Sequence, residues 1–160
     1  MGDYVSIIQE TFKPGREIGP SDWHLVTQEQ INDFAKASFD FDPMHVDPEW
    51  CKDNSPFGVP VAFGFMTMSM LTHFINTSVE KMIASSSDLK MPAYGLNYGF
   101  DRMRLVSHVP VNSRIRARFT VLNTEPKGHG VLLRFKVVVE IEDSDQPALV
   151  GEWLSIGYDT

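Results

Sequence analysis

One long apolar segment followed by four strand-like segments restricts this chain more than any other feature of its sequence. The apolar segment begins near Gly64, runs through FMTMSMLTHF and continues to about Ala84. A helix that is apolar around most of its circumference must be enclosed by other structure. Four segments of strand-like composition follow, joined by turn-forming residues: Tyr94–Val106, Arg114–Asn123, Val131–Ile141 and Leu149–Tyr158. The pattern predicts an α+β fold in which a curved antiparallel meander wraps the helix.

Alternation of residue types is clearest in the second of these segments, over residues 114–119. Its arginines fall on one face of the predicted strand and its apolar residues on the other, since side chains alternate along a strand. The apolar residues are Ile115, Ala117 and Phe119. We expect this second face to pack on the long helix.

A shorter helix is predicted ahead of the long one. Thr27 and Gln30 have the spacing of a capping box, and apolar residues at helical spacing follow until about Ser38. Residues 39–46 are then expected to form a loop, because Pro43 cannot continue a helix.

The composition of the chain excludes several classes of protein. The 160 residues include 21 Asp and Glu against 14 Lys and Arg, a net charge of −7 that argues against a general nucleic-acid binder. The single Cys51 excludes an intramolecular disulfide and a cysteine-built zinc site, and it fits a reducing compartment. The chain lacks a signal-peptide pattern and an apolar run long enough for a membrane span. We expect one domain, residues 1–160, in the cytoplasm.

The segment richest in reactive side chains is DFDPMHVDP, residues 40–48. A loop stiffened by Pro43 can turn Asp40 and His45 toward one point. The Asp40 carboxylate stands between two phenylalanines, so we expect it to be partly desolvated and a better base, while an imidazole exchanges a proton near neutral pH. Together they form a candidate general acid/base pair.

The same residue types are also ordinary turn and cap chemistry, so composition alone leaves a purely structural role open. Asp47 is assigned to structure, because an N-cap Asp followed by Pro48 at the first helical position is a common helix start.

Residues 34–51, FAKASFDFDPMHVDPEWC, resemble the signature loop of MaoC-like dehydratases and (R)-specific enoyl-CoA hydratases. In that loop an Asp is followed two residues later by Asn-Pro and five residues later by His. Asp40, Asp42-Pro43 and His45 hold those positions here. The resemblance continues through PVAFGFMTMSML, which matches the family's glycine-led central helix, and through NYGFDRMRLVSHVPVNSRIRARFTV, which is similar to the nodulation protein N branch.

The resemblance implies a hot-dog fold and the reversible syn addition of water to a trans-2-enoyl thioester, giving an (R)-3-hydroxyacyl product. Asp40 and His45 would share activation of the water and delivery of a proton to the α-carbon. The backbone N–H of Gly64 would stabilise the enolate oxygen. No cofactor is implied, since coenzyme A or acyl carrier protein only carries the substrate. The resemblance also implies a homodimer or a larger homo-oligomer.

Two residues depart from the family pattern. Phe63 stands where the family commonly has His, which removes a polar contact near the enolate oxygen, and Asp42 stands where it commonly has Asn. Asp42 adds a negative charge two residues from Asp40, and this charge opposes an enolate. We expect both residues to lie beside the bound thioester and to affect rate and substrate more than reaction class.

Other polar residues are weaker candidates for substrate binding. Thr72 lies eight residues after Gly64, where the family often has a small hydroxyl, although a helical Thr can instead bond its own backbone. Arg102 and Arg104 are candidates for the phosphates of coenzyme A. The arginines of residues 114–118 are an alternative, and a solvated outer face of the sheet is the structural interpretation of both groups. No metal site is expected, because the remaining histidines lack close spacing: His24, His73, His108 and His129.

Two other functions remain open. A hot-dog acyl thioesterase would direct the activated water at the carbonyl, and a non-catalytic protein would only bind acyl thioesters or lipids, as the changes at Phe63 and Asp42 suggest. The pairing of Asp40 with His45 favours the hydratase, because a thioesterase needs no second proton donor for an α-carbon.

Overall fold

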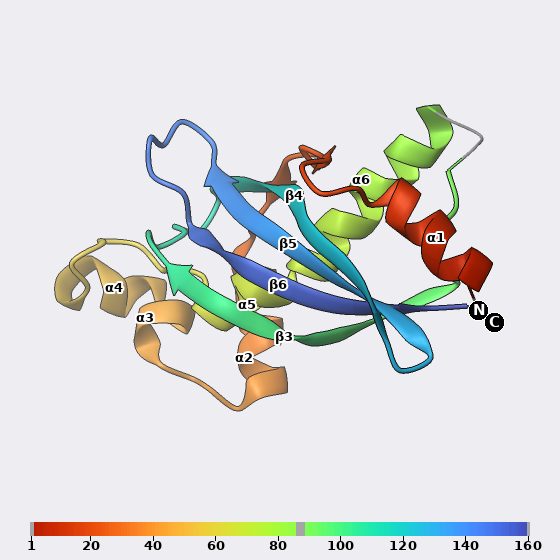
Figure 1. Ribbon diagram of the computed structural model, residues 1–160. Helices are drawn as coiled ribbons and strands as arrows, with labels where there is room; N and C mark the ends of the chain where they lie inside the picture. The colour runs from red at the N-terminus through yellow and green to blue at the C-terminus, as the bar shows by residue number, and fades with distance from the viewer. Residues whose placement is uncertain (1, 86–88, 160) are drawn as a thin grey trace.

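A computed structural model describes residues 2–85 and 89–159. An antiparallel sheet lies in front of a long helical segment, and shorter helices lie at both ends of the sheet (Figure 1). The helices are α1 (Gly2–Thr11), α2 (Gln28–Ser38), α3 (Pro43–Val46), α4 (Pro48–Asn54), α5 (Gly64–Ser69) and α6 (Leu71–Ser85). The strands are β1 (Glu17–Ile18), β2 (His24–Leu25), β3 (Tyr94–Leu105), β4 (Arg114–Lys127), β5 (Gly130–Ile141) and β6 (Leu149–Tyr158).

The predicted long helical segment is confirmed, with one interruption at Met70 between α5 and α6. Two hydroxyls just before the interruption bond backward to the helix itself. Thr67 Oγ1 donates to the carbonyl of Phe63, and Ser69 Oγ donates to the carbonyl of Phe65. The backbone hydrogen bonds continue across Met70, since its N–H donates to the carbonyl of Met66 and its carbonyl accepts from the N–H of Phe74, so the two helices form one continuous segment. No helix in the described residues is both long and apolar enough to cross a bilayer.

The four long strands are confirmed, but the prediction that they form a simple meander is wrong. The strand order is β1-β4-β5-β6-β3, so β3 pairs with β6 and not with β4. The chain after β3 does not turn back, because residues 106–113 instead bond to the segment before α5. Val61 forms an isolated bridge with Pro110, and the N–H of Ala62 donates to the carbonyl of Val109. This diversion places β3 at the edge of the sheet.

The core lies between the sheet and the central helical segment. The apolar face of β4 that the sequence predicts is fully buried: Ile115, Ala117 and Phe119 are each 0% exposed. Phe119 packs edge-on against Phe135 of β5, and Phe74 of α6 is buried in the same cluster. The expected packing of this face on the helix is therefore confirmed.

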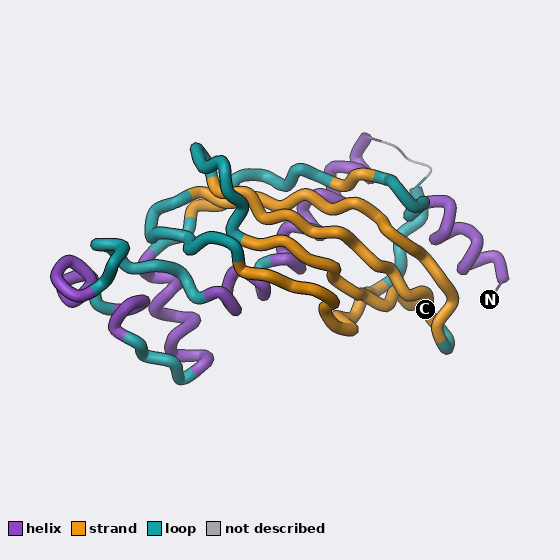
Figure 2. The backbone as a smooth tube through the Cα atoms, turned by 60° about the vertical axis from the view of Figure 1, so that its left-hand side comes forward, coloured by secondary structure: helices purple, strands orange, loops and turns teal. Residues whose placement is uncertain are grey.

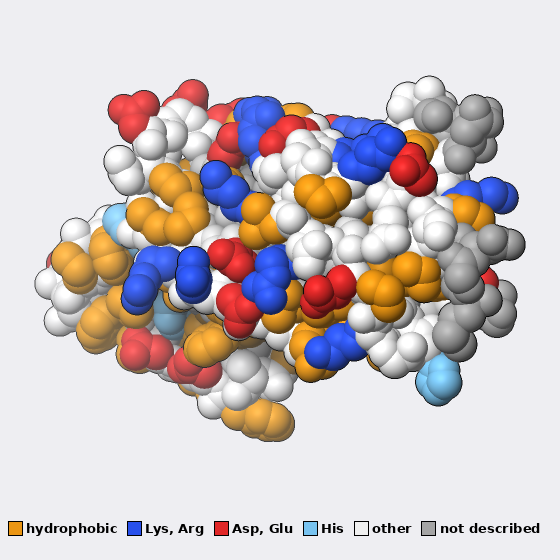
Figure 3. All heavy atoms as spheres, viewed as in Figure 1, with side chains coloured by type: hydrophobic (Ala, Val, Ile, Leu, Met, Phe, Trp, Pro, Cys, Tyr) orange, Lys and Arg blue, Asp and Glu red, His pale blue; other side chains and the backbone are white. Residues whose placement is uncertain are grey.

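The outer face of the sheet carries paired charges. Arg116 Nε and Arg118 Nε both donate to the Glu140 carboxylate, at 2.5 and 2.6 Å, and Arg114 pairs with Glu142 at 3.0 Å. Basic and acidic side chains lie side by side over this face (Figure 3). The arginines of β4 therefore have the structural role of a solvated outer face.

The helices at the end of the sheet carry the candidate loop (Figure 2). The capping box of α2 is confirmed, with both hydrogen bonds between Thr27 and Gln30 present. The predicted loop over residues 39–46 is only partly correct, because Pro43 begins the one-turn helix α3. Proline is tolerated at a first helical position, where its missing N–H would have no partner. Asp47 is confirmed as the N-cap of α4.

Candidate functional site

His45, on α3, has a fixed ring orientation. Its Nδ1 lies 2.6 Å from the carbonyl oxygen of Val61. A carbonyl oxygen only accepts, so Nδ1 carries a proton and Nε2 of the neutral ring keeps its lone pair. The ring stacks on Phe63, with centroids 3.8 Å apart. This is the tautomer that a general base at Nε2 requires.

A glutamine of α2 holds the turn that carries His45. Gln28 Nε2 donates to the backbone carbonyl of His45 at 2.8 Å and to Asn32 Oδ1 at 3.0 Å. Both amide protons are used, which fixes the amide orientation. Gln28 was not predicted from the sequence, because a helical glutamine has no spacing that distinguishes this role from surface solvation.

His45 and Gly64 line one cavity of about 280 Å³, which we call the His45 cavity. Gly64 is the first residue of α5, and its N–H has no acceptor among the described residues, as expected at a helix start. A Cβ at Gly64 would lie 2.1 Å from Leu105 Cδ1 of β3. The glycine is therefore required by the close approach of Leu105, and it leaves an N–H donor in the same cavity as the imidazole.

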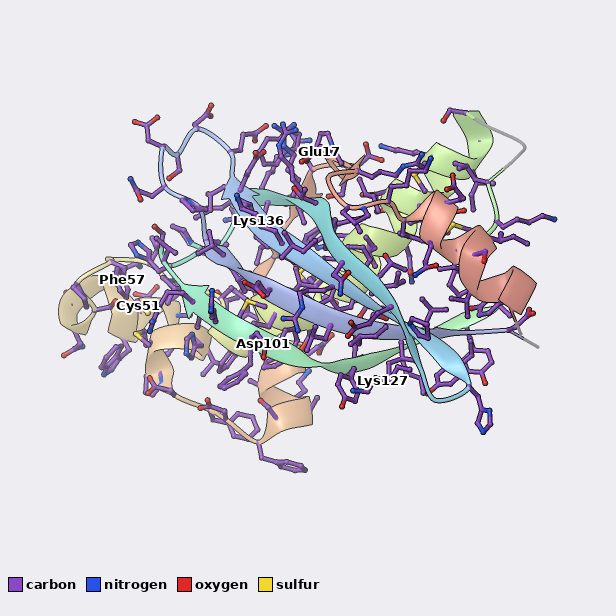
Figure 4. All side chains as sticks on the ribbon, viewed as in Figure 1. Glu17, Cys51, Phe57, Asp101, Lys127 and Lys136 are labelled. Carbon is purple, nitrogen blue, oxygen red and sulfur yellow. The ribbon has the colours of Figure 1, made fainter. Side chains whose placement is uncertain are left out.

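A second imidazole lines the His45 cavity. His108 follows β3 and stacks on Phe57, with ring centroids 4.1 Å apart. Phe57 lies beside α4 at the end of the molecule that carries α3 (Figure 4). Sequence spacing gave no reason to group His108 with His45, since 63 residues separate them and only the diverted chain after β3 brings them together.

The carboxylate of Asp40 is hydrogen-bonded to the start of α3, but Asp40 is absent from the lining of the His45 cavity. Asp40 Oδ1 accepts from the N–H of Asp42 at 3.2 Å, and the carbonyl of Asp42 accepts from the N–H of His45 at 2.9 Å. The expected desolvation of Asp40 is wrong for a single chain. Asp40 is exposed, and its neighbours Phe39 and Phe41 are 85% and 58% exposed, so neither shields the carboxylate from water.

Cys51 lies beneath α3 and is fully buried. Its Sγ–H donates to the carbonyl of Met44 at 3.4 Å. Burial raises the pKa of the Cys51 thiol, and the carboxylates of Asp47 and Asp42 raise it further. The thiol therefore stays protonated and packs α4 against α3.

Thr72 lies in a different cavity, which we call the α6 cavity. This cavity of about 390 Å³ lies between α6 and strands β3, β5 and β6, and His45 is absent from its lining. The Thr72 hydroxyl accepts from Asn97 Nδ2 at 3.4 Å and, in the part of the chain that the structure describes, makes no bond to its own helix. Among the described residues, no hydrogen bond joins Thr72 to Asp40 or His45.

The two arginines of β3 line neither cavity. Arg102 sits at a β-bulge with a positive φ of 51°, and its guanidinium lies 3.8 Å from the Glu152 carboxylate. Arg104 is exposed and makes no ion pair within residues 2–85 and 89–159. In the described part of the chain, no three His, Cys, Asp or Glu side chains gather as metal ligands would.

Comparison with known proteins decides the family. The MaoC like domain model matches residues 9–141. The chain belongs to the MaoC-like family. This MaoC-like protein is 38% identical to Nodulation protein N of Rhizobium leguminosarum bv. viciae, covering 95% of this chain and 91% of that one. It is 35% identical to 3-hydroxyacyl-thioester dehydratase Z of Mycobacterium tuberculosis, covering 95% of each.

Solved structures of MaoC-like proteins share its hot-dog fold. The monoamine oxidase regulatory protein of Archaeoglobus has a TM-score of 0.72 at 22% identity, covering 94% of each chain. The (R)-hydratase of A. caviae has a TM-score of 0.70 at 15% identity, covering 89% of this chain and 95% of that one. The predicted family and hot-dog fold are confirmed.

In this MaoC-like protein both departures from the family pattern have structural roles. Phe63 supports the ring of His45 and also contacts Phe34, with centroids 5.2 Å apart. Asp42 is the N-cap of α3, because its Oδ1 accepts from the N–H of Met44 at 2.9 Å. Each residue therefore helps to place His45.

Proposed function

We propose that this protein catalyses the reversible addition of water to trans-2-enoyl thioesters, giving (R)-3-hydroxyacyl thioesters. The observation that carries the proposal is one cavity lined both by His45, whose Nδ1 is bonded to the Val61 carbonyl, and by Gly64, the first residue of α5. The relative named 3-hydroxyacyl-thioester dehydratase Z supports the same chemistry.

The proposed reaction uses a base, a proton donor and an oxyanion donor. The oxygen of water forms a bond to the β-carbon as one residue of the Asp40–His45 pair takes its proton and the π electrons of the double bond move toward the thioester carbonyl. The other residue of the pair delivers a proton to the α-carbon from the same face, and a proton transfer within the pair restores the starting state. The Gly64 N–H donates to the thioester oxygen, on which negative charge develops. Hydrolysis of the thioester is disfavoured, since two proton-transfer groups are present where a thioesterase needs one.

The acyl chain is proposed to extend into the α6 cavity. The cavity is lined mainly by apolar residues, and Thr72 is its lining residue nearest to Gly64 along the helical segment. Eight residues of helix span about 12 Å at 1.5 Å per residue, so the acyl group would have to be longer than a four-carbon chain to reach it. Arg102 and Arg104 are exposed at the cavity-lining strand β3 and would bind phosphate of coenzyme A or of the acyl carrier protein prosthetic group.

The working form is proposed to be a homodimer of one-domain chains in the cytoplasm. Strand β3 is an edge strand whose apolar side chains are exposed, and Phe39 and Phe65 are exposed beside the candidate site. A second copy would cover these side chains and supply the desolvation that Asp40 lacks in one chain. Solved relatives of the fold include the HadBC and ChsH1-ChsH2 complexes of Mycobacterium tuberculosis.

Substitution of the two catalytic candidates tests the reaction. Asp40→Asn and His45→Gln are each expected to fold and to lose at least about two orders of magnitude in hydration rate, because each removes a positioned acid or base. Asp47→Asn, which keeps the α4 cap, and His129→Gln, on the exposed β4–β5 turn, are the matched controls. Near-normal turnover by Asp40→Asn or His45→Gln would contradict the assignment.

The assay separates the three candidate functions. Trans-2-dodecenoyl-CoA is incubated with the protein while enone absorbance and free thiol are followed together. Loss of the enone alone identifies a hydratase, release of thiol identifies a thioesterase, and binding without either change identifies an accessory protein.

A further inference from the structure

The α6 cavity contains a buried polar group that the proposed reaction does not use. Trp153 of β6 lines this cavity and is only 3% exposed, and its Nε1–H meets no acceptor in the described part of the chain. Its aromatic neighbours, Phe119 and Phe135, offer no oxygen or nitrogen. Buried indole N–H groups usually have a partner, because the N–H gives up its bond to water on burial.

Two of the other polar side chains that line the cavity already make hydrogen bonds. Asn97 donates to Thr72, and the Ser155 hydroxyl donates to a backbone carbonyl of β3. Asn76 of α6 makes no side-chain hydrogen bond with any residue that the structure describes. Asn76 is exposed and its amide is open to water, so the buried N–H of Trp153 is the donor that remains without an acceptor beside a cavity lined mainly by apolar residues.

An all-carbon chain in this cavity would leave the Trp153 N–H unpaired. An acyl chain with an oxygen at the right position would accept a hydrogen bond from Trp153 Nε1 and restore the bond that burial removes. Sites built to bond an oxygen discriminate strongly against ligands that lack it, because the buried donor then stays unpaired.

We propose that the α6 cavity selects acyl chains that carry an oxygen acceptor remote from the thioester, such as an ether, hydroxyl or keto oxygen, and that Trp153 is the residue that recognises it. The inference rests on the proposed function, because it names the substrate class of the same site.

Equilibrium binding tests this selection without relying on turnover. Dodecanoyl-CoA is compared by calorimetry with analogues of equal length in which one methylene is replaced by an ether oxygen, moved along the chain. We expect one oxygen position to bind at least about tenfold more tightly than the all-carbon chain, which corresponds to about 1.4 kcal/mol. Equal or weaker binding at every position would overturn the inference and indicate that water alone satisfies the N–H.

A substitution identifies the donor. Trp153→Phe removes the N–H and keeps an aromatic ring, so the preference for the ether chain should disappear while the all-carbon chain binds within about threefold of the wild-type protein. Trp23→Phe, at the outer face of the sheet beside Arg116, is the matched control and should keep the preference. A preference that survives Trp153→Phe would overturn the assignment to Trp153.

Failure of the proposed function gives a different result. If trans-2-dodecenoyl-CoA is not hydrated but the ether chain still binds more tightly, the reaction is wrong and the selection stands. If the enoyl chain is hydrated and no ether chain binds better, the reaction stands and the selection is wrong. The comparison of dodecanoyl-CoA with its ether analogues uses the wild-type protein, so it does not depend on whether any variant folds.

Discussion

The orientation of His45 depends on residues far away in the sequence. The carbonyl of Val61 fixes the proton on Nδ1 of His45. The side chain of Gln28, on α2, holds the backbone carbonyl of His45. A one-turn helix such as α3 has too few internal hydrogen bonds to hold a side chain by itself. The placement of His45, the proposed base, therefore depends on these two external bonds.

Loss of the glutamine should reduce turnover more than substrate binding. In Gln28→Leu the His45 carbonyl loses its donor, and we expect kcat to fall by about tenfold with little change in KM, because the imidazole is displaced and the binding surfaces are not. Unfolding in urea should show a stability loss of about 1–3 kcal/mol from the unpaired carbonyl.

Asn32→Ala is the matched control, since it removes the other acceptor of Gln28 and leaves the bond to His45 in place. Equal effects on kcat in Gln28→Leu and Asn32→Ala would show that Gln28 only stabilises α2.

For single residues, the sequence predicts which side chains a local motif groups together. The spacing of Asp40, Asp42 and His45 is enough to group them along the chain, and hydrogen bonds through the backbone of Asp42 link them, but Asp40 is absent from the lining of the His45 cavity. Gln28 and Val61 were not predictable, because each acts on His45 through a bond that depends on tertiary placement. The exposure of Asp40 was also not predictable, since adjacent phenylalanines shield a carboxylate only if something holds them over it.

Among the elements, β4 and β5 are joined by the charged pairs of the outer face. Burial raises the pKa of Glu140, but the hydrogen bonds from Arg116 and Arg118 outweigh it, so the pKa lies below its ordinary value of 4.5. The ionised carboxylate therefore stabilises the folded chain above that value. This contribution is lost as the pH falls through the lowered pKa.

Substitution of Glu140 should show this pH dependence directly. Glu140→Gln should lower the free energy of unfolding by about 1 kcal/mol at pH 7, and the difference from the wild-type protein should vanish once the pH lies below the lowered pKa of Glu140. Chemical denaturation at several pH values measures it. Glu142→Gln removes a carboxylate that meets a single arginine and should have a smaller effect. A difference independent of pH would contradict the electrostatic explanation.

Elements with a strong local pattern were predicted well, and those without one were missed. The capping box of α2 and the alternation in β4 fix their types from sequence alone. Strands β1 and β2 have two residues each, too few for any alternation to be recognised. The predicted meander gave β3 the wrong partner, because the composition of a strand does not encode which strand it pairs with. That pairing follows from residues 106–113, which bond to the segment before α5.

For the whole molecule, the exposed edge predicts assembly. Leu96 and Tyr98 of β3 are each about half exposed, and an unpaired apolar edge strand readily pairs with another chain. Analytical ultracentrifugation of the wild-type protein should show a dimer. Leu96→Lys and Tyr98→Lys should each shift it toward the monomer and reduce hydration by at least about tenfold, because Asp40 would stay in water. Leu122→Lys, at an exposed position on β4, should neither dissociate the dimer nor reduce hydration. A wild-type monomer with full activity would contradict the dimer.

The position of β3 also has a consequence for biosynthesis. Strand β3 leaves the ribosome before β4, β5 and β6, yet its partner in the described chain is β6, which is made last. At about 5–20 residues per second an apolar strand therefore waits some seconds without its neighbour. During that interval it can pair with other nascent chains, so slow translation through β4 and β5 should increase aggregation. Chaperones that bind extended apolar segments should capture chains that stop before Leu149 more readily than complete ones.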